Sequence, residues 1–146
     1  LFSEVTLLPR QWYMLAFSFV DDSFLGVHLG HQGKEGEVVL DPLGGYEMEP
    51  DLRPDSESDL IFGAQRSGLF RGLIGPFGVF SGEHLGENLE ETLRDMLEQP
   101  LVIPPAIEMK NVLLWSVDGI QDLSENKLQL KRVGTGKKSK IPKAEE

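Results

Sequence analysis

The stretch Trp12-Tyr-Met-Leu-Ala-Phe-Ser-Phe-Val20 decides the fold, because it combines high strand propensity with a complete lack of charge. On one face of the expected strand every side chain is large and apolar, namely Tyr13, Leu15, Phe17 and Phe19. The opposite face, which starts at Trp12, is also apolar. Apolar character on both faces is typical of the middle of a sheet, so we predict a central strand that is covered on both sides.

Shorter apolar runs follow this strand and precede it, at residues 2–8, 24–29, 37–40, 60–62, 69–80, 111–117 and 127–133. The 16 glycines and 9 prolines lie largely between these runs, which is typical of an all-β protein with many turns. Pro76 cannot donate a hydrogen bond to a neighbouring strand, so we expect a bulge or a sheet edge there. The pattern predicts a mostly antiparallel β-sandwich.

One helix is predicted, near residues 88–98. Its apolar positions recur at helical spacing and form one stripe: Leu89, Leu93, Met96 and Leu97. Asn88 followed by Glu91 has the residue types of a capping box, and Pro100 would end the helix. We expect the stripe to be buried against the sandwich.

The chain has the size of one ordinary domain and divides into four segments. Residues 1–98 form the sandwich body, and residues 99–110 form a proline-containing connector. Residues 111–133 form a pair of strands, and residues 134–146 form a basic, flexible tail that has little to bury.

Charge and cysteine content limit the expected partners and the expected compartment of the protein. The net charge of −10 combines a balance of −15 over residues 1–126 with +5 over residues 127–146. An acidic body disfavours nucleic acid as a partner, because phosphate contacts need clustered Lys and Arg. The apolar runs are too short for a membrane span. The lack of cysteine favours the reducing cytoplasm, with an extracellular location as the alternative.

Five motifs in a fixed order resemble a known family. They are Gln11-Trp12-Tyr-Met-Leu15, Leu25-Gly-Val-His-Leu-Gly30, Leu60-Ile-Phe-Gly63, Phe70-Arg-Gly-Leu-Ile74 continuing through Phe77-Gly-Val-Phe80, and His84-Leu85 before the helix. This order resembles the laminin-G-like or concanavalin A-like lectin domain. The spelling is similar to the lectin-like domain of BEACH-containing scaffold proteins and to thrombospondin-type amino-terminal domains. The resemblance implies a jelly-roll sandwich and a non-enzymatic module that binds a protein or glycan through its rim loops.

The order of elements departs from that family in the last part of the chain. Asn111-Val-Leu-Leu-Trp115, the turn Asp122-Leu-Ser-Glu-Asn126 and Leu128-Gln-Leu130 resemble the beginning of a family domain. Residues 111–133 therefore either complete this sandwich or open a next module. We expect the strand from Val112 to Val117 to pair with the sheet of the tryptophan strand. Pairing within the chain is favoured, and the alternative is a homo-oligomer formed by strand exchange.

Acidic residues in two expected loops are candidate calcium ligands: Asp21, Asp22, Asp55, Glu57 and Asp59. Calcium takes carboxylate and carbonyl oxygens, and family members with a rim calcium use acidic loop residues of this kind. Ordinary turn chemistry, in which Asp and Ser favour tight bends, is the competing and preferred interpretation. No other cofactor is expected.

The sequence does not predict a catalytic constellation. The nearest approach to the carboxylate pair of a glycosidase is Glu47-Met-Glu49-Pro-Asp51, which lies in a proline-rich loop. A glycoside-active enzyme on the same fold and a structural packing subunit of a large assembly are the two alternatives to a binding module. Trp12 and Trp115 invite a sugar-stacking interpretation, but we expect both in the core, because both lie in apolar strands.

Overall fold

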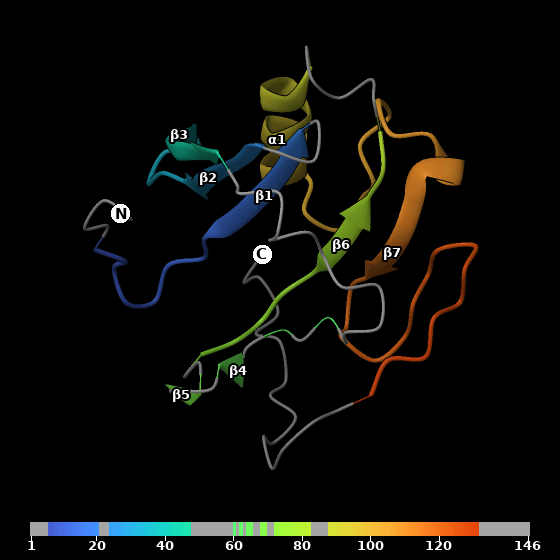
Figure 1. Ribbon diagram of the computed structural model, residues 1–146. Coiled ribbons are helices and arrows are strands. Elements are labelled where there is room, and N and C mark those ends of the chain that lie inside the picture. Colours follow the sequence, from blue (N-terminus) through green and yellow to red (C-terminus); the bar gives the residue numbers. More distant parts are fainter. Residues whose placement is uncertain are drawn as a thin grey trace. The chain divides into compact units, whose positions relative to one another are not determined.

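The computed structural model describes residues 6–20, 24–47, 60, 62, 64–65, 68–69, 72–82 and 88–131 (Figure 1). The chain forms two compact units. Unit 1 comprises Leu1–Asp59 and Gly82–Ile107, and unit 2 comprises Leu60–Ser81 and Glu108–Glu146. In the described part the sheets are antiparallel and there is one α-helix, which agrees with the predicted mostly-β class.

Unit 1 is built on a three-stranded meander. Strands β1 (Met14–Val20), β2 (Phe24–Gln32) and β3 (Val38–Glu47) follow in sequence order, and each pairs antiparallel with the next. A tight turn joins β2 to β3: Gly33 N donates to Glu37 O at 2.7 Å, and Gly36 N donates to Gly33 O at 3.1 Å. Gly36 has a φ of 83°, which only glycine adopts without a steric penalty. The turn therefore sets the register of the two strands.

Helix α1 (Leu89–Glu98) packs against β2 and β3 of this meander (Figure 1). Leu93 and Leu97 are buried, and a Cβ at Gly30 would overlap Leu97 Cδ1, so the helix lies close to the sheet at this point. Two side chains tie the elements together: Gln32 Nε2 donates to Leu97 O at 2.9 Å, and Arg94 Nη1 donates to Val38 O at 3.3 Å. The predicted apolar stripe is confirmed in part, since Leu93 and Leu97 are buried whereas Leu89 and Met96 are half-buried.

Three local expectations about unit 1 are wrong. Asn88 stands before α1, but its side chain makes no capping hydrogen bond. Strand β1 lies at the edge of the described three-stranded sheet rather than in its middle, and Trp12 is 54% exposed. Alternation had identified the strand correctly, but it could not show which side chains have a second layer above them.

Unit 2 contains two short antiparallel pairs. Strands β4 (Ala64–Gln65) and β5 (Gly68–Leu69) form one, and β6 (Phe77–Phe80) and β7 (Val112–Ser116) form the other. The one-turn 3₁₀ helix η2 (Met109–Asn111) leads into β7. Trp115 is buried, as predicted, and its ring lies 6.0 Å from that of Phe80.

The pairing of β7 corrects one expectation and refines another. Its partner in the described residues is β6, so it does not join the sheet of the tryptophan strand. Pro76 immediately precedes β6, and residues 72–76 are not strand, so the apolar run 69–80 is not one continuous strand. A register shift between Val79 and Phe80 lies within β6 rather than at the proline.

We expect Leu93→Ala to lower the free energy of unfolding by about 2–5 kcal/mol, because it opens a cavity between α1 and the sheet. Leu101→Ala is the matched control. Leu101 is 61% exposed, so its truncation should change stability by less than about 0.5 kcal/mol. Urea unfolding followed by circular dichroism measures both. Equal, small effects would mean that the helix contributes no packing energy.

Candidate functional site

The predicted calcium ligands cannot be placed. Asp21, Asp22, Asp55, Glu57 and Asp59 all lie outside the described residues, as do Glu49 and Asp51 of the carboxylate-rich loop. Over the described ranges, no group of three or more His, Asp or Glu side chains could hold a metal ion. Calcium therefore stays a prediction.

The loop after β7, residues 117–131, is held by hydrogen bonds from side chains to the backbone. It begins with an Asx turn, in which Asp118 Oδ1 accepts hydrogen bonds from Ile120 N at 2.9 Å and Gln121 N at 3.1 Å. Gly119 has a φ of 69° and donates its N–H to Ser116 Oγ at 3.0 Å. The chain thereby reverses direction directly after the strand.

The carboxylate of Asp122 is the centre of this loop. Oδ1 accepts hydrogen bonds from Trp115 N at 3.1 Å and Ser124 N at 2.9 Å. Oδ2 accepts from Ser124 Oγ at 2.8 Å and Leu128 N at 2.8 Å. The residue is buried. Each carboxylate oxygen accepts two hydrogen bonds, three of the four from backbone N–H groups. No lone pair is therefore directed at a ligand.

Burial and hydrogen bonding have opposite effects on the pKa of Asp122. Burial of Asp122 raises its pKa, but the hydrogen bonds from the backbone N–H groups of Ser124, Trp115 and Leu128 and from the Ser124 hydroxyl outweigh burial. They lower the pKa from 3.8 to about 2. The charged form is thus the one that the fold stabilises.

The loop then returns along β7. Leu123 N donates to Trp115 O at 2.7 Å. Asn126 Nδ2 donates to Leu113 O at 2.9 Å. These bonds satisfy carbonyl groups of β7, so the segment Asp122 to Asn126 runs beside the strand without being a strand itself.

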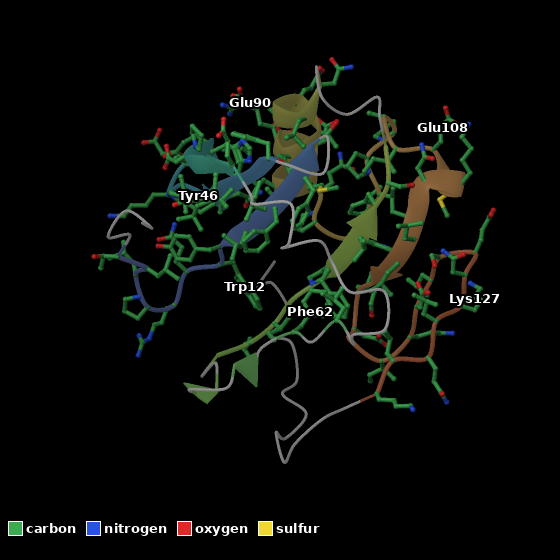
Figure 2. All side chains as sticks on the ribbon, viewed as in Figure 1. Trp12, Tyr46, Phe62, Glu90, Glu108 and Lys127 are labelled. Atoms are coloured by element: carbon green, nitrogen blue, oxygen red, sulfur yellow. The ribbon has the colours of Figure 1, made fainter. Side chains whose placement is uncertain are left out.

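The hydrogen-bonded loop at residues 117–131 exposes apolar side chains to solvent. Ile120, Leu123 and Leu128 are each about half exposed. An open pocket of about 280 Å³ lies within the loop, lined by Ile120, Gln121, Asp122, Lys127, Leu128, Gln129 and Leu130. Lys127, labelled in Figure 2, has a left-handed φ of 50°. The loop therefore combines a fixed backbone with an accessible mixed surface.

The sequence predicts the turn at residues 122–126 but not the hydrogen bonds that converge on Asp122. The available signal was the spacing Asp-x-Ser-x-Asn, three side chains that readily bond to nearby backbone. The expected strand over residues 127–133 is not present at residues 127–131, which are irregular; residues 132–133 lie outside the description. The alternation of Leu128 and Leu130 with polar residues indicated a strand, yet Leu128 N bonds to Asp122 instead.

Other polar groups in the described ranges do not gather into a second site. Nδ1 of His28 in β2 and Oγ1 of Thr92 in α1 are buried without a hydrogen-bond partner in the described structure. The ring of His31 lies 5.5 Å from that of Tyr13. Glu47 is exposed at the end of β3. These residues show no shared geometry that would support a reaction.

Comparisons of the chain with protein-family models, with curated proteins and with solved structures return no significant match. The resemblance to the laminin-G-like family thus stays a prediction. None of the helices in the described part of the chain has the length and apolar character that crossing a bilayer requires.

We expect Asp122→Asn to destabilise the protein by about 2 kcal/mol at neutral pH, because an amide replaces a charged acceptor of four hydrogen bonds. Asp118→Asn is the matched control, since an asparagine keeps the Oδ1 that accepts in the Asx turn. It should change stability by less than about 0.5 kcal/mol. Chemical unfolding at neutral pH measures both variants.

The same carboxylate makes stability depend on pH. Because folding lowers the pKa of Asp122, its stabilisation is fully present above pH 3.8 and is lost as the pH falls to about 2. The loss should be about 2 kcal/mol across that window. Asp122→Asn should lack this component, so its unfolding free energy should fall less steeply than that of the parent chain. Parallel slopes would contradict the assignment.

Proposed function

We propose that this chain is a non-enzymatic recognition module that binds a protein partner through the loop at residues 117–131. The observation that carries the proposal is the set of four hydrogen bonds on Asp122, which fix a loop that exposes Ile120, Leu123 and Leu128. Loops held by a rigid scaffold are common binding elements. A loop that is already ordered loses less conformational entropy when it binds, which favours affinity.

The lining of the pocket favours a protein over a glycan. Asp, Gln, Lys, Leu and Ile residues surround it, and the lining within the described loop holds no aromatic ring. Sugar rings commonly bind by stacking on aromatic side chains. A mixed aliphatic and polar surface matches the average composition of a protein interface. Exposed Trp12 lies in the other unit and is not part of this lining.

The proposed scaffold is a laminin-G-like, concanavalin-type jelly-roll sandwich. Its support is the antiparallel meander of unit 1, where α1 packs against β2 and β3 while Leu15, Phe17 and Phe19 of β1 remain more than half exposed. A second layer packed over this apolar face would complete a sandwich, and it would not occupy the outer edge of β1. The resemblance of the ordered motifs supports the same scaffold.

The test compares binding by the parent chain with binding by the double variant Ile120→Asp/Leu128→Asp. Photo-crosslinking with the purified chain would identify a protein partner, and titration with that purified partner would then measure affinity. We expect the double variant to lose binding at least tenfold, because carboxylates replace the exposed apolar contacts. Leu101→Asp, an equally exposed control in unit 1, should bind normally.

A glycan array tested with the same proteins separates the two partner classes. Selective glycan binding that survives the double substitution would contradict the proposed loop and the proposed class together. Unchanged affinity of the double variant for a protein partner would contradict the loop alone.

We also propose that calcium, if bound, is held by the carboxylates predicted for the loops, Asp21, Asp22, Asp55, Glu57 and Asp59. A ligand that binds only the folded state raises the melting temperature as its concentration increases. Calcium should therefore raise the melting temperature of the parent chain, and Asp21→Asn/Asp22→Asn should reduce the increase. Equal melting temperatures with calcium and with chelator would show that the folded chain does not bind calcium.

A further inference from the structure

The sequence of β1 contains none of the residues that protect a sheet edge. Residues 14–20 contain no charge, no proline and no glycine, and their pairing with β2 has no register shift. Within the described residues, β2 is the strand hydrogen-bonded to β1, which leaves one row of β1 backbone groups at the edge of the sheet. A flat, uncharged edge of this kind readily accepts another strand.

The opposite edge of the same sheet is protected. Strand β3 contains Asp41 and Pro42, and proline has no N–H to offer a new strand. Gly44 has a φ of 137°, and the register with β2 shifts between Val27 and His28. These irregularities prevent regular pairing along β3. The contrast between the two edges singles out β1 as the edge that can extend the sheet.

The side chains of β1 are sorted by size between its two faces. Leu15, Phe17 and Phe19 lie on one face, opposite Leu29, Val27 and Leu25 of β2, respectively. The first three are 54%, 53% and 59% exposed, whereas their neighbours Val27 and Leu29 are buried. The other face of β1 carries the half-buried residues Met14, Ala16 and Ser18. One face of the edge strand is thus a row of accessible large apolar groups.

This row is complementary to itself in an antiparallel arrangement. A two-fold axis at Phe17 would place Phe17 opposite Phe17 of a second copy, and Leu15 opposite Phe19 of that copy. Aromatic and aliphatic pairs directly across two strands stabilise a sheet. No like charges would meet, although the chain as a whole is acidic, because β1 is uncharged.

We propose that β1 pairs antiparallel with β1 of a second copy, centred on Phe17, and so joins two three-stranded sheets into one. The contact is isologous, since the same strand serves both protomers. Two strands of this length bury less surface than a standard interface, so we expect a reversible dimer with a dissociation constant in the micromolar range. The inference rests on unit 1 and is independent of the proposed loop in unit 2.

Cysteine substitution gives a register-specific test, because the 146-residue chain contains no cysteine of its own. With Phe17→Cys, the two introduced thiols would face each other at about 5 Å between Cβ atoms, within reach of a disulfide. Mild oxidation should then give a covalent dimer on a non-reducing gel.

Leu15→Cys is the matched control, because Leu15 and Phe17 are almost equally exposed. In the proposed register its two thiols would be about 13 Å apart, too far for a disulfide. The double variant Leu15→Cys/Phe19→Cys should restore cross-linking, because each thiol then faces the other type. Equal cross-linking of both single variants would indicate random collision and overturn the proposal.

Sedimentation provides a second measurement that needs no oxidation. The parent chain should change from monomer to dimer as its concentration rises through the micromolar range, and Phe17→Lys should weaken the dimer at least tenfold. Leu101→Lys should dimerise as the parent does, because Leu101 is exposed but lies outside the sheet. A parent chain that stays monomeric at every concentration, or a Phe17→Lys variant that dimerises normally, would overturn the proposal.

Discussion

The convergence of four hydrogen-bond donors on one buried carboxylate is the constraint on which the organisation of residues 112–131 depends. Asp122 binds the backbone of the strand before it, through Trp115, and of the chain after it, through Leu128. One side chain thus replaces the ladder of hydrogen bonds that a further strand would supply. A neutral side chain at this position would leave backbone donors buried and unsatisfied, which costs more than the hydrogen bonds themselves contribute.

In unit 1, packing of α1 against the sheet fixes the arrangement of the elements, whereas in unit 2 hydrogen bonds to Asp122 do so. The close approach of Leu97 to Gly30 lets α1 lie near the sheet, and Gln32 and Arg94 then bond to carbonyl groups of Leu97 and Val38. The small residue on the strand leaves room for the large residue on the helix, because a Cβ at Gly30 would displace the end of the Leu97 side chain. The helix therefore has a specific position over β2 and β3.

Periodic patterns predicted the individual helix and strands of this structure better than they predicted which strands pair. The 3.6-residue period of Leu89, Leu93 and Leu97 identified α1 to within a residue of its ends, and alternation identified β1. The edge position of β1 and the pairing of β7 with β6 could not be derived, because strand order depends on long-range contacts that no local pattern encodes. Asn88 has the chemistry of a cap, yet its backbone conformation does not place the side chain for one.

The candidate site was predictable only in part, for a related reason. The Asp-x-Ser-x-Asn spacing indicates a turn, but the number of donors that reach Asp122 depends on how the loop folds back on β7. Both tryptophans have apolar neighbours in sequence, and both are expected in the core. Trp115 is buried, whereas Trp12 is exposed. Apolar sequence context therefore does not distinguish a tryptophan inside a core from an exposed one that precedes a strand.

The sequence separation of the contacts also sets an order for folding. Around Asp122 the hydrogen bonds join residues between 2 and 14 positions apart, whereas those that anchor α1 to the sheet span 56 and 65 positions. Closing a longer loop costs more chain entropy before any contact is gained. The turn after β7 is therefore suited to early formation, and docking of the helix to a late, slower step. During synthesis on the ribosome, β1 to β3 emerge well before α1, so the helix-binding face of this sheet is exposed until residues 89–98 leave the exit tunnel.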